Sequence, residues 1–235
     1  MCGRYTLTSP GETVAEVFDL VAVPEVLPRY NLAPTQEAAV VRVVRPGAPR
    51  TLDPLRWGLI PAWAKEPGIG NRMINARAES VAEKPGYRDS FRQKRCLVPA
   101  NGFYEWQAVG KLKQPYLIRR QDRQVFGFAG LWSTWRGAEG NTLETFTIIT
   151  TTPNDVLRPL HDRMPVILDR RDFAAWLDPA NRDRDHLQSL LVPAPPAGWE
   201  AIPVSRAVNN PANDHPTCIE PLVQDDPPPG PLFES

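Results

Sequence analysis

Hydrophobic and polar positions along the chain predict many short strands and few helices. β-Branched and aromatic runs bounded by turn residues predict strands at 38–44, 125–132, 145–151 and 166–168. Residues 96–107 and 115–119 predict a hairpin around Gly110. No pattern repeats with a period of about 20–50 residues. We therefore expect an α+β fold, with a curled, largely antiparallel, barrel-like sheet as its core and short helices around it.

The helical signals are short and scattered. Residues 9–12, Ser-Pro-Gly-Glu, have the pattern of a capping box with proline at the first helical position, and Val14, Val17 and Phe18 then recur on one face. Residues 192–199 predict an extended strap, and 203–208 a strand that returns to the body. Further segments with room for two or three helical turns are 78–84, 87–93, 154–160, 172–177 and 183–191.

Composition limits the class of protein. The chain has 235 residues, 42% of them hydrophobic, which is enough for a proper core and too many for a disordered protein. We expect one domain over 1–222 and a disordered, proline-rich tail over 223–235. No run of 18 apolar residues predicts a membrane span, and the N-terminus lacks a signal-peptide pattern, so we expect a cytosolic protein.

Cysteine and histidine are too few and too scattered for a metal centre. The three cysteines form no C-x-x-C, and the three histidines lie far apart in the sequence, so we expect neither a zinc site nor a disulfide framework. We expect no cofactor. No amphipathic surface demands a partner subunit, which favours a monomer.

Charge is unevenly distributed although the net charge is zero. Residues 209–235 carry five acids and no Lys or Arg, so the remaining body holds 27 basic against 22 acidic residues, a charge of +5. Arginine outnumbers lysine by 22 to 5, and its guanidinium binds phosphate and stacks on bases. This bias is compatible with a nucleic-acid partner, and equally with a high-GC genome that favours Arg codons.

Cys2 is the position with the most distinctive chemistry. Its small side chain permits removal of Met1, which would leave an N-terminal cysteine with an amine and a thiol on adjacent carbons. Such a group can trap an aldehyde: the amine forms a Schiff base and the thiolate closes a thiazolidine ring. It can also serve as the nucleophile of a self-processing hydrolase. On position alone, Cys2 can equally be an incidental second residue.

Seven motifs in order resemble one family, the SOS response-associated peptidases, whose members are abasic-site processing proteins. The resemblance runs from Cys2 to about Leu222. It implies that family's fold and a cytoplasmic bacterial protein that acts at the nucleoid after damage. It also implies that the protein binds single-stranded DNA with abasic sites, captures the ring-opened aldehyde on Cys2, shields the lesion, and has a peptidase activity that exposes the cysteine. The motifs are MCGRY, YNLAPTQ (30–36), RWGLIPAW (56–63), NARAE (75–79), CLVPANGFYEW (96–106), HDRMPVIL (161–168) and PVSRAV (203–208).

Two side chains in these motifs suit proton transfer. Glu105 follows Phe103 and Tyr104 and precedes Trp106, and such neighbours would desolvate the carboxyl and raise its pKa; otherwise it is a charge on an edge strand. His161 ends a predicted short helix, where a lone histidine is either structural or suited to opening a sugar ring. The resemblance implies that they are the family's catalytic glutamate and active-site histidine.

Candidate DNA contacts come from the same motifs. Asn75 and Arg77 share a face if 75–77 is extended, so that Asn75 could hydrogen-bond the captured sugar and Arg77 a phosphate; the alternative is a turn with a surface charge. Ala64 stands where some relatives carry a second aromatic, which weakens any expectation about how a duplex would be split. The other predicted contacts, including aromatic and proline surfaces for stacking, are Arg4, Asn31, Pro34, Trp57, Pro61, Trp63, Ser205 and Arg206.

Three functions are compatible with these residues. The first is a DNA-repair protein with covalent, lyase-like capture of abasic sites. The second is an N-terminal-nucleophile peptidase that acts on proteins. The third is a non-covalent binder of single-stranded DNA in which Cys2 has no role.

Overall fold

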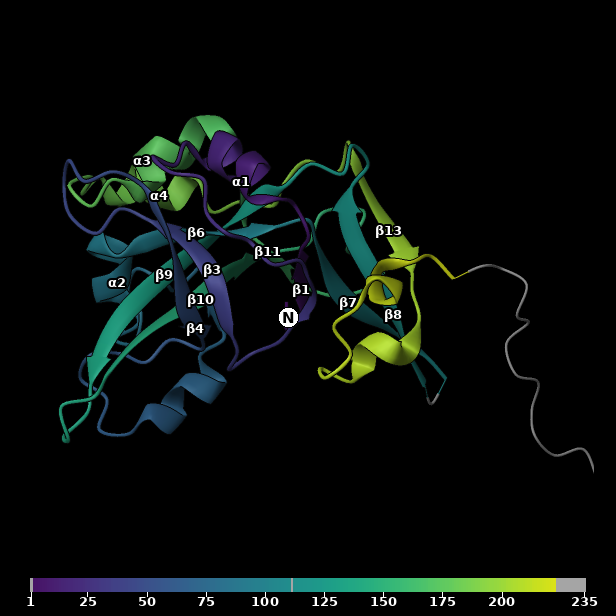
Figure 1. Ribbon diagram of the computed structural model, residues 1–235, viewed down its shortest axis with the longest axis horizontal. Coiled ribbons are helices and arrows are strands. Elements are labelled where there is room, and N and C mark those ends of the chain that lie inside the picture. The colour runs from purple at the N-terminus through teal and green to yellow at the C-terminus, as the bar shows by residue number, and fades with distance from the viewer. Residues whose placement is uncertain (1, 111, 223–235) are drawn as a thin grey trace, which may run out of the picture.

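Two β-sheets stand side by side in this computed structural model, which describes residues 2–110 and 112–222 (Figure 1). The strands are β1 (Tyr5–Leu7), β2 (Arg29–Leu32), β3 (Glu37–Arg42), β4 (Thr51–Trp57), β5 (Asn75–Arg77), β6 (Arg95–Ala100), β7 (Gly102–Val109), β8 (Leu112–Arg120), β9 (Phe126–Arg136), β10 (Thr142–Thr151), β11 (Met164–Pro165), β12 (Ile167–Leu168) and β13 (Trp199–Pro203). The helices are α1 (Gly11–Phe18), α2 (Arg88–Gln93), α3 (Phe173–Leu177) and α4 (Arg184–Ser189), with 3-10 turns η1 (Pro67–Arg72), η2 (Arg170–Asp172), η3 (Arg206–Asn209) and η4 (Pro216–Ile219).

The larger sheet closes on itself as a barrel. β10 pairs with β4, β4 with β3, β3 with β6, β6 with β9, and β9 returns to β10. Four of these five pairings are antiparallel and β10–β4 is parallel. β5 adds a parallel pairing to β10, and β11 and β12 pair with β10 and β9. The predicted α+β fold with a curled, largely antiparallel, barrel-like core is confirmed.

The second sheet has five strands in the order β13-β8-β7-β1-β2, all antiparallel. The N-terminal strand β1 therefore lies inside a sheet, between β2 and β7. Tyr5 stands opposite Phe103, and the backbone N–H of Tyr104 donates to the carbonyl of Arg4 at 2.9 Å. The pairing thus continues toward the N-terminus and brings Cys2 to the level of β7.

Aromatic rings join the two sheets. Tyr5 of the five-stranded sheet meets Trp57 and Phe128 of the barrel edge to face, with ring centroids 5.3 and 5.9 Å apart. Phe103 contacts Phe128 at 5.8 Å, and all four rings are fully buried. Because such pairs add about 0.5–1.5 kcal/mol beyond the burial of their area, this seam holds the sheets in a fixed relation.

A single residue divides the strand predicted over 96–107. β6 belongs to the barrel and β7 to the five-stranded sheet, with Asn101 between them. The Asn101 side chain accepts hydrogen bonds from the backbone N–H groups of Thr8 and Ser9 and donates to the Ser9 hydroxyl at 2.8 Å. The sequence Asn101-Gly102 is typical of a turn, yet 96–107 was predicted as one strand where the structure has two.

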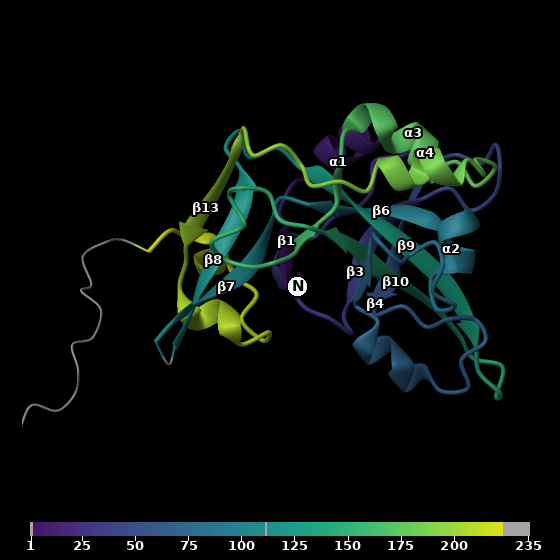
Figure 2. The same ribbon diagram turned by 180° about the vertical axis from the view of Figure 1, so that it is seen from behind.

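Helices cover one end of the barrel, as both views show (Figures 1 and 2). α1 stacks Phe18 on Phe173 of α3 at 5.3 Å between ring centroids, and the predicted helix face with Val14 and Phe18 is buried. The predicted capping box is wrong: Pro10 occupies the N-cap position without a side-chain cap, because the Ser9 hydroxyl is engaged by Asn101.

The remaining predicted elements are confirmed in part. The segments 87–93, 172–177 and 183–191 contain α2, α3 and α4, whereas 78–84 and 154–160 form turns. The predicted strand 203–208 ends at Pro203, and η3 follows. The predicted disordered tail, 223–235, lies outside the described residues. Among the helices of the described ranges, none is long and apolar enough to cross a bilayer.

Candidate active site

Cys2 is fully buried, and it precedes β1, which lies where the five-stranded sheet meets the barrel (Figures 1 and 2). Its carbonyl accepts a hydrogen bond from the side-chain amide of Asn75 at 2.8 Å. Asn75 opens β5, and the Tyr87 hydroxyl donates to its carbonyl at 3.1 Å. The segment 75–77 is extended as expected. Asn75 of the barrel sheet therefore positions the backbone of Cys2, which leads into β1 of the five-stranded sheet.

Glu105 lies on β7, opposite Tyr116 of β8, and its side chain is buried. Burial raises the pKa of Glu105 to about 7, which leaves comparable amounts of acid and carboxylate near neutral pH. Burial, and then the nearby charge of Glu105, raise the pKa of the Cys2 thiol. The thiol is therefore protonated at rest, and its activation requires a group that takes its proton.

The cause of this desolvation differs in part from the expected one. Phe103 packs in the main core, on the inner face of β7, whereas Tyr104 and Trp106 pack in a separate small cluster behind the strand. Side chains alternate along a strand, so Glu105 shares the face of Phe103. Glu105 therefore lies on the side of the main core, and Tyr104 and Trp106 lie on the other side of the strand.

His161 lies in the turn that follows β10. Its backbone N–H donates to the carbonyl of Leu157, and its Nδ1 accepts a hydrogen bond from the backbone N–H of Arg163 at 3.0 Å. Burial lowers the pKa of His161, so the neutral ring predominates at neutral pH. The Asp162 carboxylate, which is exposed, lies 2.8 Å from the same Nδ1.

One cavity of about 440 Å³ brings Glu105 and His161 together. The rest of its lining comes from the five-stranded sheet and the segment after β13. An acid with a raised pKa and a histidine with a lowered pKa thus face the same space, beside a buried cysteine, which is an arrangement suited to proton transfer. The lining residues are Arg4, Glu105, Trp106, Lys113, His161 and Asn209.

Three of these residues were not predicted as site residues. Trp106 is next to Glu105 in the sequence, and its indole N–H donates to Asn209 Oδ1 at 2.7 Å. Its position next to Glu105 in the sequence could have indicated that Trp106 belongs to the site. Lys113 and Asn209 reach the cavity from the β7–β8 hairpin and from η3, and no sequence pattern marks them.

Arg4 and Asn31 both donate hydrogen bonds to the C-terminal segment. Arg4 donates to Asn31 Oδ1 and to the carbonyl of Val208, both at 2.8 Å, and its guanidinium lies over the Trp106 ring. Asn31 is fully buried, and its side-chain amide donates to the carbonyls of residues 208, 210 and 213. The expectation that Asn31 faces DNA is therefore corrected: its polar atoms are used within the protein.

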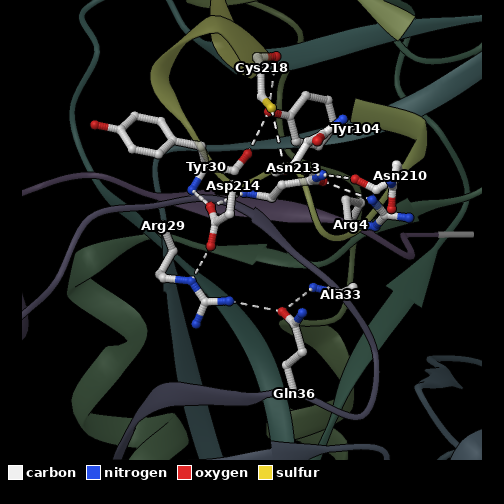
Figure 3. A network of polar contacts seen from close by, with 11 residues as sticks. Arg4, Arg29, Tyr30, Ala33, Gln36, Tyr104, Asn210, Asn213, Asp214 and Cys218 are labelled. Atoms are coloured by element: carbon white, nitrogen blue, oxygen red, sulfur yellow. Dashed lines mark hydrogen bonds and ion pairs between the residues drawn. The ribbon is translucent and has the colours of Figure 1, made fainter. Parts of the chain in front are cut away.

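Asp214 completes this network of hydrogen bonds to the C-terminal segment, which we call the polar clamp (Figure 3). Its carboxylate accepts hydrogen bonds from the backbone N–H groups of Tyr30 and Asn31, at 2.5 and 2.9 Å, and pairs with the Arg29 guanidinium. Gln36 accepts a hydrogen bond from the same guanidinium at 2.9 Å. The loop that carries the predicted YNLAPTQ motif thus anchors residues 204–222, which form one wall of the cavity through Asn209.

The predicted DNA contacts differ in their exposure. Trp57 is fully buried between Tyr5 and Phe146, so the expectation that it stacks on bases is corrected. Pro61 is also buried, and the Ser205 hydroxyl caps η3 by accepting the N–H of Ala207 at 3.2 Å. Pro34 is half-buried, and the side chains left exposed are Trp63, Arg77 and Arg206.

Fold and site together define a barrel-and-sheet protein with a cysteine near its N-terminus, buried beside an amide, a carboxyl and a histidine. Residues 1–211 match the model of the family described as SOS response associated peptidase (SRAP), and the chain belongs to that family.

Named relatives agree with this assignment. "Abasic site processing protein YoqW" from Bacillus subtilis is 46% identical over 224 residues, covering 94% of this chain and 99% of its own. "Abasic site processing protein HMCES" from Xenopus tropicalis is 32% identical over 83% of this chain and 67% of its own. The crystal structure of a protein from Bacteroides thetaiotaomicron matches with a TM-score of 0.82 at 26% identity, covering 94% of this chain and all of that one.

Proposed function

We propose that this protein processes abasic sites by capturing them covalently in single-stranded DNA, as a thiazolidine on Cys2 after Met1 has been removed. The observation that carries the proposal is the placement of Cys2 at the seam, held by Asn75 and close enough to Glu105 for the carboxylate to raise the thiol pKa. The names of the relatives, which are abasic site processing proteins, support the choice of substrate.

The chemistry is a condensation of an aldehyde with an aminothiol. The Cys2 amine attacks C1′ of the ring-opened sugar and forms a carbinolamine, which loses water to give the Schiff base. The Cys2 sulfur then bonds to the same carbon, and the thiol proton moves to the nitrogen. One water molecule leaves for each crosslink, and no external oxidant or cofactor is consumed.

Glu105 supplies the acid–base steps in this scheme. With a pKa of about 7, its carboxylate can take a proton from the amine or the thiol, and its acid form can protonate the departing hydroxyl. His161 lines the same cavity and would donate a hydrogen bond to the ring oxygen as the closed sugar opens. General acid–base catalysis of this kind typically contributes about 10²–10⁴-fold.

The proposed chemistry favours single-stranded DNA over a duplex. A sugar must leave the line of the backbone for C1′ to reach a nucleophile at the seam, and base pairing and stacking oppose that movement. Arg77 is exposed two residues after Asn75 on β5, so its side chain leaves that strand on the same side. We assign phosphate contacts to Arg77 and Arg206 and base stacking to Trp63, whose side chains are exposed.

Intact-mass measurement tests the proposal. The wild-type protein should lack Met1 and, after mixing with a single strand that carries one abasic site, gain the mass of the strand less one water. Cys2→Ala should bind undamaged single strands and form no adduct. Cys218→Ala, which removes another buried free thiol, is the matched control and should crosslink normally.

Other outcomes would select the alternatives. Retained Met1 in protein that crosslinks would exclude the thiazolidine, because the ring needs a free amine. An adduct that persists in Cys2→Ala would place the chemistry elsewhere. Binding without any adduct in either protein would leave a non-covalent DNA binder, and cleavage of protein substrates that depends on Cys2 would favour the peptidase.

A further inference from the structure

The side chain of Arg163 is clamped at several points near the cavity. The side chain is 13% exposed, and its guanidinium donates to both carboxylate oxygens of Glu79, at 2.6 and 3.0 Å. It also donates to the carbonyl of Thr150 at 2.5 Å. The hydrogen bond from Arg163 holds the pKa of Glu79 below its usual range. This carboxylate is therefore ionised at neutral pH, and the bidentate ion pair with Arg163 persists.

This clamp joins the two elements of the barrel sheet that carry site residues. Glu79 lies two residues beyond the end of β5, which carries Asn75, and Thr150 lies at the end of β10. The backbone N–H of Ala78 donates to the same Thr150 carbonyl at 2.8 Å. Residue 163 is therefore fixed relative to both strands, although it lies in the connection that leads to β11.

The backbone of Arg163 hydrogen-bonds directly to His161, the candidate catalytic residue. Its N–H donates to Nδ1 of His161 at 3.0 Å, and a ring nitrogen that accepts a hydrogen bond carries no hydrogen. The neutral ring is thus held as the tautomer with hydrogen on Nε2. The contact of Nδ1 with the exposed Asp162 carboxylate requires a hydrogen on Nδ1, as in the protonated ring or the other neutral tautomer, and it therefore competes with the Arg163 N–H for the same atom.

We propose that Arg163 is a positioning residue that fixes His161 as a hydrogen donor through Nε2. The clamp on its side chain holds its backbone N–H against Nδ1, and Nε2 carries hydrogen whether the ring is neutral or protonated. His161 then cannot accept a proton through Nε2, and the role of base falls to Glu105. This division of roles rests on the proposed function, in which the sugar oxygen is the acceptor.

Nitrogen NMR of protein labelled with ¹⁵N-histidine tests the tautomer directly. The chain has three histidines, and a His161→Asn variant identifies the signals of His161. In the wild type, Nε2 should show the shift of a protonated nitrogen and Nδ1 that of a bare one. Arg163→Met keeps the backbone N–H but removes the clamp, and it should move both shifts toward a mixture of tautomers.

The rate of crosslinking to abasic single strands is the second measurement. Arg163→Met should slow it roughly 10- to 100-fold, the scale of effect that misplacing a catalytic group produces. The matched control is Arg158→Met, because Arg158 pairs with Asp155 on the surface of the same connection, with both side chains exposed. This control should change neither the shifts nor the rate.

The two measurements separate the possible failures. Unchanged nitrogen shifts in Arg163→Met would overturn the proposal, even if crosslinking slows, because Arg163 would then act on DNA itself. Altered shifts with an unchanged rate would overturn its role in the reaction. A wild type that never crosslinks would refute the proposed function while the shifts still decide the tautomer. If Arg163→Met does not fold, Glu79→Gln weakens the same clamp and should move the shifts in the same direction.

Discussion

The barrel and the five-stranded sheet are held together by different forces. The barrel is closed, so each strand of the ring has a partner on both sides, and stacked aromatics such as Trp57 and Phe146 fill its core. The five-stranded sheet is open, and behind β7 it has only a small apolar cluster around Tyr104 and Val208. Polar contacts from Asn31 and Asp214 hold the C-terminal segment there instead.

This difference bears on the site because each region supplies half of it. The barrel sheet supplies Asn75 and the connection with His161, whereas the five-stranded sheet supplies Glu105 and, next to β1, Cys2. Apolar packing gives a stable wall that is insensitive to small changes. A buried polar network depends on each donor and acceptor, so it fixes the geometry of the opposite wall and is easily disturbed.

The largest expected effect is in the barrel. Trp57→Ala removes a fully buried indole and should lower the free energy of unfolding by about 3–5 kcal/mol, measured by urea denaturation. Trp63→Ala is the matched control: its side chain is 59% exposed, so we expect a change below about 1 kcal/mol together with weaker binding to single strands. Equal destabilisation by both variants would contradict the placement of Trp57 in the core.

A somewhat smaller effect is expected in the polar clamp. Asn31→Ala removes one of the two acceptors of the Arg4 guanidinium and the amide that donates to three carbonyls of residues 208–213, which should cost about 2–4 kcal/mol. Hydrogen exchange should rise first in residues 204–222, before the barrel opens. Asn71→Ala, which removes a single exposed hydrogen bond from Arg56, should leave exchange there unchanged. Uniform loss of protection across both sheets would argue against a separate clamp.

The smallest expected effect is at the seam and depends on pH. The folded state raises the pKa of Glu105 from 4.5 to about 7, so between these values the folded protein binds a proton that the unfolded chain has released. Stability should therefore fall as pH rises through this window, by roughly 1–3 kcal/mol. Glu105→Gln should remove this fall and be the more stable protein at pH 8, while it crosslinks more slowly. Parallel stability curves for the two proteins would show that Glu105 titrates normally.

The sequence was sufficient to predict the fold class because the signal is local. Runs such as 38–44 and 145–151 alternate or concentrate β-branched residues, and both became barrel strands. The break at Asn101 was missed although Asn101-Gly102 interrupts the hydrophobic run, because that dipeptide alone does not show that the strands on its two sides belong to different sheets. The pattern around Ser9 misled for a related reason: its hydroxyl bonds to Asn101, more than 90 residues away in the sequence.

Candidate site residues could be predicted where a short motif contains a reactive or polar side chain. Cys2, Asn75, Glu105 and His161 are polar or reactive residues in short motifs, and the structure places each of them at the seam or on the cavity. Burial was not predictable from the same motifs. Trp57 and Trp63 stand six residues apart in one motif, yet β4 ends at the first, and only tertiary packing decides which ring faces the core.

The interior position of β1 also delays the pairing of this strand during translation. β1 cannot complete its sheet until β7, which spans Gly102–Val109, has emerged to pair with it. At about 5–20 residues per second, the first residues of the nascent chain stay unpaired on that side for roughly 5–20 s. During this interval an aminopeptidase can reach the start of the chain, whereas the finished protein buries Cys2 completely. The removal of Met1 that the proposed thiazolidine requires is thereby favoured on the ribosome, before folding encloses Cys2.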